Sequence, residues 1–119
     1  MSGLDVMKRL YGAQYAEEVE KRLNELSPTF SSIVQSIAYD QFWAREGINI
    51  REKSLITIAA LVAQGKEEQT KIHMRGFLES GGKLEELEAT LIHLIVYCGF
   101  PAVMNALSIL NIVKKELKP

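Results

Sequence analysis

The sequence predicts an all-α protein of about six helices in a single domain. Apolar residues recur at intervals of three and four along the chain, and no segment alternates between apolar and polar residues over more than a few positions. Residues that start and end helices separate these segments. A chain of 119 residues is long enough to remove roughly two-thirds of its unfolded surface from water. We therefore expect one domain over residues 1–119.

The first helical segment, residues 4–26, carries apolar residues among many charges. It forms either one amphipathic helix or a broken pair, with the break expected at Gly12. Ser27 and Pro28 then indicate a new start, because a serine oxygen caps free backbone N–H groups and proline fits the first turn of a helix. This second helix should run to about Ala44.

Asn49 and Glu52 have the spacing of a capping box, and an apolar run follows directly. A third helix should therefore begin here and end at Gly65. A fourth should begin near Lys66 and end at the glycine pair 81–82, where glycine can take the left-handed conformation that ends helices.

The fifth helix is expected over residues 84–97 and the sixth over residues 102–117, with a turn at residues 99–101 between them. Residues 91–106 are almost unbroken in their apolar character, so we expect this segment to be buried against several neighbours. The third and fifth helices are too apolar for the surface of so small a domain. Self-association would bury them, which predicts a homo-oligomer with a mainly helical interface.

Composition excludes several classes of partner. Fourteen basic and fifteen acidic residues give a net charge of −1, which offers no general attraction to nucleic acid or to anionic membranes. No apolar run is long enough for a membrane span. The first residues lack the features of secretory and organelle targeting peptides, so a cytoplasmic location is expected.

Cys98 is the single cysteine, so one chain can form neither a disulfide framework nor a two-cysteine redox centre. Because it lies in the most apolar segment, we expect it to behave as a small, inert core side chain. A reactive thiol at Cys98 is the alternative.

Several separated residues together resemble the carboxymuconolactone decarboxylase family. The family has a His-x-Arg-x-x-x-x-x-Gly segment upstream of a Tyr-x-Gly-x-Pro-Ala segment, and the order and spacing agree here over residues 39–107. The matching positions are residues 42–45, 51–61, 65, 73, 75, 81, 86, 97, 99, 101–102 and 105–106. The resemblance implies an alkylhydroperoxidase-like helical bundle, assembled as trimers or hexamers with active sites near subunit boundaries.

The family has a redox branch and a decarboxylase branch. The redox branch uses a Cys-x-x-Cys-x-x-x-His motif and an upstream glutamate, whose positions fall on Lys66, Gln69, His73 and Ser54 in this chain. Only the histidine is kept. The resemblance therefore implies the decarboxylase branch, which releases carbon dioxide from γ-carboxymuconolactone and needs neither a metal nor an organic cofactor.

His73 is the first catalytic candidate, as a general acid or as a donor to an oxyanion, because imidazole changes charge near neutral pH. The alternative is that His73 completes a buried hydrogen-bond network. Gln69 shares its helix face and is a candidate for substrate binding. Tyr97 is a second catalytic candidate and His93, on the same helix face, a binding candidate. Both could instead be packing residues.

A substrate with carboxylate groups needs cationic partners, for which arginine is well suited. Arg45 and Arg51 flank a turn that follows Trp43, whose ring could form an apolar wall for a flat lactone. Arg75 is a further binding candidate, and for all three arginines the alternative is a surface charge or an ion pair. Lys53 stands where many decarboxylases have arginine, which puts the identity of the substrate in doubt.

Two histidines twenty positions apart, with no carboxylate at ligand spacing, predict no metal site. The sequence thus predicts a decarboxylase that acts on a small carboxylated molecule without a cofactor. Two alternatives stay open: a peroxidase or disulfide reductase that uses Cys98, and a ligand-binding helical oligomer without catalysis.

Overall fold

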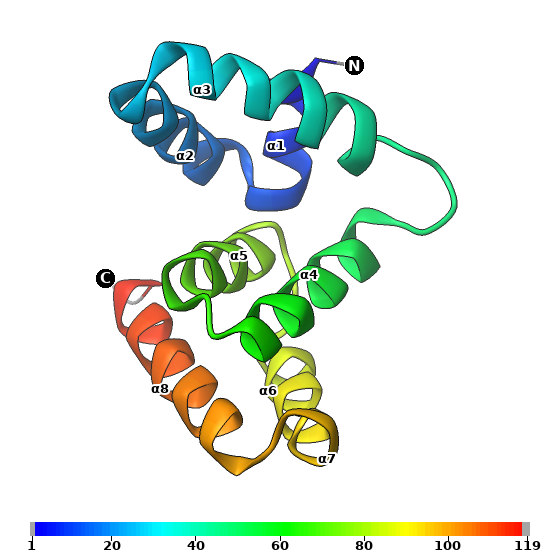
Figure 1. The fold of residues 1–119 in the computed structure, drawn as a ribbon, viewed down its shortest axis with the longest axis vertical. Coiled ribbons are helices and arrows are strands. Elements are labelled where there is room, and N and C mark those ends of the chain that lie inside the picture. Colours follow the sequence, from blue (N-terminus) through cyan, green and yellow to red (C-terminus); the bar gives the residue numbers. More distant parts are fainter. Residues whose placement is uncertain (1, 118–119) are drawn as a thin grey trace.

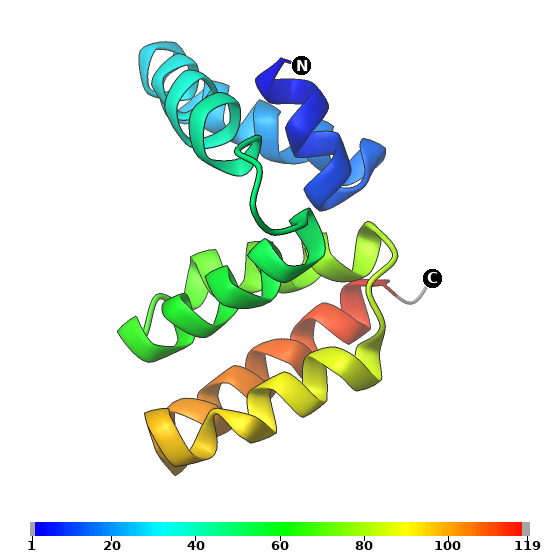
Figure 2. The same cartoon turned by 90° about the vertical axis from the view of Figure 1, so that its right-hand side faces the viewer.

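The computed structural model describes residues 2–117, and its regular structure is helical throughout that range. The elements in chain order are α1 (Gly3–Tyr11), α2 (Ala13–Leu26), α3 (Pro28–Ile33), η1 (Val34–Trp43), α4 (Ile50–Gln64), α5 (Glu67–Glu79), α6 (Leu84–His93), α7 (Ile95–Cys98) and α8 (Phe100–Leu117). Figures 1 and 2 show α1, α2 and α3 on one side of α4 and α5, with α6, α7 and α8 on the other side. The predicted all-α class is confirmed, although the described residues form nine helical elements rather than about six.

The opening segment is a broken pair, and the break lies at Gly12 as predicted. Gly12 has a φ of 85°, and its backbone N–H donates to the carbonyl of Lys8 to close α1. The next start is also confirmed, since the Ser27 hydroxyl accepts from the Phe30 N–H at 3.1 Å and Pro28 stands at the first helical position.

The predicted helix from Pro28 to Ala44 is continuous but changes its winding. From Val34 to Trp43 it is a π-helix, closed by a bond from the Ala44 N–H to the Tyr39 carbonyl, five residues back, at 3.0 Å. The sequence pattern did not indicate this change, because no residue type in the segment marks the place where an α-helix becomes a π-helix. Such wide turns occur often at functional sites.

Helix α4 has both bonds of the predicted capping box between Asn49 and Glu52, and it ends at Gly65 in the left-handed conformation. Helix α5 begins at Glu67, after the two residues Gly65 and Lys66, and ends at Glu79. The glycine pair 81–82 closes it as predicted, because Gly81 has a φ of 106° and the Gly82 N–H donates to the Phe77 carbonyl at 2.8 Å.

The last two predicted helices differ from the structure. The fifth breaks at Leu94, where the Cys98 N–H donates to the Leu94 carbonyl at 2.7 Å and starts the short α7. Helix α8 begins at Phe100, so Pro101 lies in its first turn rather than in the preceding loop. Proline is tolerated there because the first N–H groups of a helix have no intrahelical partner.

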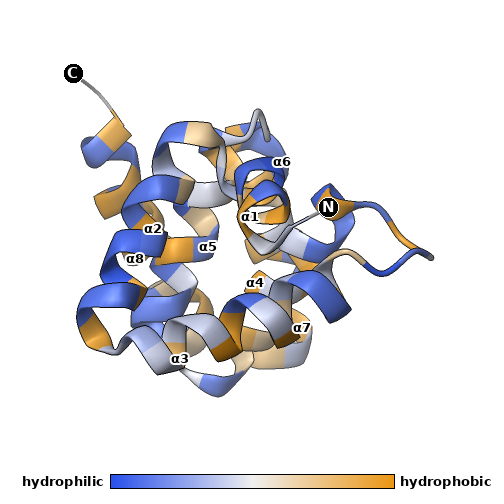
Figure 3. Cartoon of the chain, turned by 90° about the horizontal axis from the view of Figure 1, so that it is seen from above, coloured by the Kyte–Doolittle hydropathy of each residue, from blue (hydrophilic) through white to orange (hydrophobic). Residues whose placement is uncertain are grey.

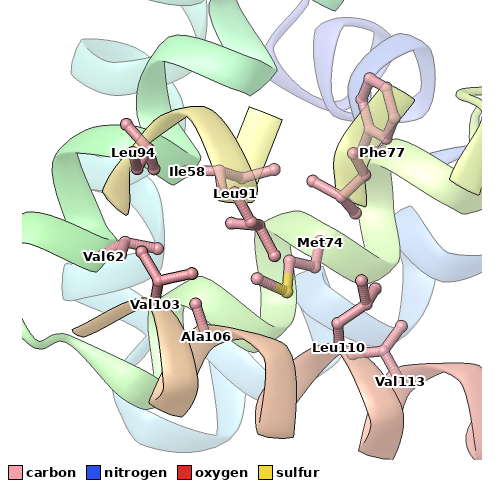
Figure 4. Close-up of a cluster of buried hydrophobic side chains, with 11 residues drawn as sticks. Ile58, Val62, Met74, Phe77, Leu91, Leu94, Val103, Ala106, Leu110 and Val113 are labelled. Carbon is pink, nitrogen blue, oxygen red and sulfur yellow. The ribbon is translucent and has the colours of Figure 1, made fainter. Parts of the chain in front are cut away.

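Two groups of buried side chains hold the helices together. One lies between α1, α2 and η1, and its members are Val6, Met7, Leu10, Tyr11, Tyr15, Ala16, Val19 and Tyr39. The other lies between α4, α5, α6 and α8, and its members are Ile58, Val62, Met74, Phe77, Leu87, Leu91, Leu94, Val103, Ala106, Leu110 and Val113. In Figure 4, Met74 of α5 points between Leu91 and Leu110. We call these the first and the second cluster.

The prediction that residues 91–106 are buried is wrong for several positions in the single chain. Val96 is 79% exposed, Phe100 73% and Met104 69%. These residues belong to α7 and the start of α8, whose other faces complete the second cluster.

Figure 3 shows hydrophobic and hydrophilic residues in bands along most helices, as an amphipathic pattern requires. Among the described residues, no helix is long and apolar enough to cross a membrane.

Candidate active site around His73

His73 lies where the two clusters meet. It belongs to α5, which packs against α1 and α2 on one side and against α4 and α8 on the other. Its imidazole lies beside two aromatic rings, with centroids 5.5 Å from Tyr11 of the first cluster and 5.8 Å from Trp43, which packs against that cluster. His73 is 8% exposed, so its imidazole is almost entirely removed from water.

A chain of hydroxyl groups leads to the imidazole. The Tyr39 and Tyr11 hydroxyl oxygens are 2.9 Å apart, and the Tyr11 hydroxyl lies 3.5 Å from Nε2 of His73. The rings of Tyr11 and Tyr39 meet edge to face at a centroid distance of 6.2 Å. Three helices, α1, η1 and α5, thus contribute one residue each to a buried polar network.

Trp43 stacks on the imidazole. The two ring planes are 4° apart, and the Trp43 side chain is half-buried. Lys53 holds the end of η1 in place, because its ammonium group donates to the carbonyls of Phe42 (3.4 Å), Trp43 (2.9 Å) and Arg45. Lys53 therefore fixes the backbone that carries the Trp43 ring.

Gly76 allows Tyr11 to reach this position. A Cβ atom at Gly76 would lie 2.3 Å from Cδ1 of the Tyr11 ring, closer than any real side chain permits. Gly76 stands three residues after His73 on α5, so the ring lies flat against the helix and its hydroxyl extends toward the imidazole. A glycine in a helix interior costs about 0.5–1 kcal/mol relative to alanine, and this contact is the reason for it.

Burial keeps all three groups uncharged at neutral pH. Removal from water lowers the pKa of His73 to about 4. The same cause raises the pKa of Tyr11 well above its ordinary value, and the pKa of Tyr39 as well. At pH 7 the site therefore presents a neutral imidazole beside two neutral phenols.

The second imidazole nitrogen, Nδ1 of His73, is buried and has no hydrogen-bond partner among the described residues. Buried polar atoms without partners are rare in native proteins, and they often mark a place where a ligand or water binds. In a neutral imidazole, Nδ1 is either an N–H donor or a lone-pair acceptor.

The outer side of Trp43 lines a hollow of about 440 Å³ between η1 and the start of α4. Its lining includes the basic residues Arg9, Arg45 and Lys53 and the acidic residues Asp40 and Glu46. A smaller hollow of about 230 Å³ lies beside it, lined by Phe42, Trp43, Ile48, Lys53, Ile56 and Thr57. The structure thus brings Trp43 and Arg45 together next to His73.

The other two predicted arginines lie elsewhere and are already paired. Arg51 forms an ion pair with Glu86 on α6, with Nε 3.0 Å from the carboxylate. Arg75 lies 4.4 Å from the centroid of the Tyr15 ring and within 3.6 Å of three carboxylates, those of Glu18, Glu79 and Glu116. No carboxylate within residues 2–117 forms an ion pair with Arg45.

The remaining candidates are not part of this arrangement within one chain. Gln69 is exposed near the start of α5. Tyr97 and His93 contact each other at a centroid distance of 5.7 Å and are both exposed. They belong to α6 and α7, and Figures 1 and 2 place α7 at the end of the molecule opposite α1 to α3. Cys98 is half-buried and packs against the second cluster.

Sequence reasoning did not identify Tyr11, Tyr39 or Gly76 as part of the site. The two tyrosines are separated from His73 by 62 and 34 positions, so no local spacing joins them. Gly76 did carry a usable signal, because a glycine inside an otherwise helical pattern often marks a close contact.

The comparisons with known proteins agree with the predicted resemblance. The model of the carboxymuconolactone decarboxylase family matches residues 28–111. A 4-carboxymuconolactone decarboxylase of Acinetobacter baylyi is 30% identical over 115 residues, covering 97% of this chain and 86% of the relative. A nitrosuccinic acid decarboxylase of Metarhizium robertsii is 25% identical over 105 residues, covering 88% and 73% of the two chains. An uncharacterized 15.0 kDa protein of Paracoccus denitrificans is 28% identical over 98 residues, covering 81% and 73%.

Proposed function

Because this chain belongs to the carboxymuconolactone decarboxylase family, we propose that it is a cofactor-independent decarboxylase of a small carboxylated lactone such as γ-carboxymuconolactone. One observation carries the proposal: a buried, neutral His73 with an unpartnered nitrogen, next to the hollow formed by Trp43 and Arg45.

The reaction requires stabilisation of negative charge on oxygen. When the C–C bond to the carboxylate breaks, its electron pair moves into the conjugated lactone carbonyl and carbon dioxide leaves. The resulting dienolate then takes up one proton at carbon. A neutral imidazole N–H can donate to the developing oxyanion without the cost of keeping a buried cation. We therefore assign His73 the role of oxyanion donor, rather than that of an imidazolium acid.

Arg45 is the arginine best suited to hold a substrate carboxylate. Arg51 and Arg75 are each neutralised by carboxylates of the chain, whereas Arg45 lines the hollow beside Trp43. A planar guanidinium binds a carboxylate with two parallel hydrogen bonds, and the indole offers a flat apolar wall to the lactone ring. Since Nδ1 of His73 is buried, a substrate group reaches it only when the surrounding side chains move.

We further propose that the protein is a homo-oligomer, a trimer or hexamer as the resemblance implies. The exposed apolar side chains at the end of α6, in α7 and at the start of α8 support this proposal; they are Ile92, Val96, Tyr97, Phe100 and Met104. Tyr97 and His93 belong to the same face. They could therefore serve catalysis or substrate binding only in a site formed between subunits.

The experiment is turnover of γ-carboxymuconolactone by the purified protein, followed by substrate loss and carbon dioxide release, beside the Cys98→Ser variant. Equal turnover by both proteins supports a decarboxylase that needs no thiol. Absence of turnover by the unaltered protein removes this substrate. Peroxide reduction by the unaltered protein, lost in Cys98→Ser, would instead establish redox chemistry.

A further inference from the structure

We infer that Tyr39 and Tyr11 form a one-way hydrogen-bond relay that fixes His73 as the tautomer with its proton on Nδ1. In this relay the Tyr39 hydroxyl donates to the Tyr11 hydroxyl, which donates to Nε2 of His73. Tyr11 is then a positioning residue that decides which atom His73 offers to a substrate. The catalytic consequence rests on the proposed function, but the tautomer itself does not.

Counting protons gives the direction of the relay. Each phenol has one proton to donate, and Tyr39 has Tyr11 as the partner of its hydroxyl within the described residues. If Tyr39 donates to Tyr11 and Tyr11 donates to His73, both phenol protons are used. Tyr39 is 6% exposed, so its proton needs such a partner inside the protein.

The opposite direction leaves a phenol proton without an acceptor. If Nε2–H donated to Tyr11 and Tyr11 donated to Tyr39, the buried Tyr39 proton would have no acceptor among residues 2–117. An unsatisfied buried donor costs about 1–3 kcal/mol. Nδ1 has no partner in either arrangement: it is an unpaired donor in the first and an unpaired acceptor in the second. The second arrangement therefore leaves two buried groups unpaired, Nδ1 and the Tyr39 hydroxyl proton, whereas the first leaves one. The balance therefore favours Nδ1–H.

The packing around the Tyr11 ring fixes the position of its hydroxyl group. Tyr11 is 1% exposed, and its ring lies between Gly76 on α5 and the rings of Tyr15 and Tyr39. The 3.5 Å between the Tyr11 hydroxyl and Nε2 is long, as is common for such bonds before a ligand tightens a site. Tyr11 lies before residues 28–111, the stretch that the family model matches.

The tautomer has a direct chemical consequence. A neutral histidine with its proton on Nδ1 presents a donor at the one ring nitrogen that lacks a partner. Such a donor is what an oxyanion on the substrate requires. The other tautomer would present a lone pair there and repel the same oxygen.

The test is ¹⁵N NMR of histidine-labelled protein at neutral pH, where the two imidazole nitrogens report separately which one carries the proton. His93→Gln is used as the background, since it leaves His73 as the single histidine. We expect Nδ1 to be protonated in this background and a mixture of tautomers in Tyr11→Phe. Tyr39→Phe should shift the tautomer ratio less, because Tyr11 can still donate to Nε2.

Protonation at Nε2 in the His93→Gln background, or an unchanged tautomer in Tyr11→Phe with native circular dichroism, would overturn the relay. The NMR measurement requires no turnover, so it tests the tautomer of His73 even if the proposed substrate is wrong. If the protein is active, Tyr11→Phe should lower kcat about tenfold with little change in KM, since a positioned donor is typically worth more than one order of magnitude.

Discussion

The indole of Trp43 lies parallel to the imidazole of His73, with 4° between the planes and 5.8 Å between the centroids. Trp43 is the last residue of η1, while His73 is in the middle of α5. The stacked pair therefore joins the two halves of the chain at the place where the hollow beside Arg45 begins. It also covers one face of the imidazole and helps to keep it out of water.

The burial of His73 should make stability depend on pH. The unfolded chain binds a proton at His73 near pH 6.5, whereas the folded protein does so only near pH 4. Between these values the unfolded state binds more protons, so the free energy of unfolding is highest above pH 6.5 and decreases as the pH falls. We expect a loss of about 2 kcal/mol between about pH 7.5 and pH 5, measured by urea unfolding.

Two variants separate this effect from the titration of acidic residues. In His73→Gln, the free energy of unfolding should not show the decrease that His73 causes between about pH 7.5 and pH 5. His93→Gln removes an exposed histidine, so this variant should still show that decrease. An identical pH dependence in all three proteins would mean that His73 is not buried as described.

Gly76→Ala should destabilise the fold by about 1–3 kcal/mol, the usual cost of overpacking a core. The added methyl group would lie 2.3 Å from the Tyr11 ring and force it away from α5. A thermodynamic cycle with Tyr11→Val measures this contact. In the Tyr11→Val background the same Gly76→Ala change should cost nothing or stabilise the helix, because the ring is gone. Equal costs in both backgrounds would contradict the proposed contact.

Lys53→Met should loosen the end of η1. It removes the ammonium group that donates to three backbone carbonyls, a loss expected to cost about 2 kcal/mol. Trp43 is the single tryptophan, so its fluorescence should shift to longer wavelength as the ring becomes more exposed. Lys66→Met is the matched control, since Lys66 is exposed, and it should change stability by less than about 0.5 kcal/mol.

Arg45→Gln should raise KM for a carboxylated substrate roughly tenfold or more, because it removes a charge-assisted hydrogen bond from the binding hollow. Arg51→Gln should leave KM within about twofold, since that guanidinium is bound to Glu86 in another part of the surface. Steady-state kinetics of the two variants give the comparison. A larger effect from Arg51 would indicate that the substrate binds near Arg51 and Glu86 instead.

The sequence predicted the helices well where local chemistry decides them. The capping box at Asn49, the start at Ser27 and the break at Gly12 depend on residues within one turn, and all three are present. The π-helix was missed because no residue type marks where the winding changes. The inclusion of Pro101 in α8 was missed because a proline can either end a helix or stand in the first turn of the next one.

The site was harder to predict than the fold. Trp43, singled out from the sequence, stacks on His73 and lines one hollow with Arg45. The contact between Tyr11 and His73, by contrast, joins positions 62 residues apart. Periodicity shows that Tyr11 faces a core without showing which residue it meets there. The burial predicted for Val96 and Phe100 failed for a different reason. Their apolar character predicts burial, but the single chain offers these side chains no partner.

The most direct measurement compares kcat/KM of His73→Gln and His93→Gln with that of the unaltered protein, using γ-carboxymuconolactone. We expect His73→Gln to lose about two to three orders of magnitude, the usual effect of removing an oxyanion donor. His93→Gln should lose less than His73→Gln, because His93 lies on another face of the chain. Full activity in folded His73→Gln would show that the buried imidazole is structural and that catalysis occurs elsewhere.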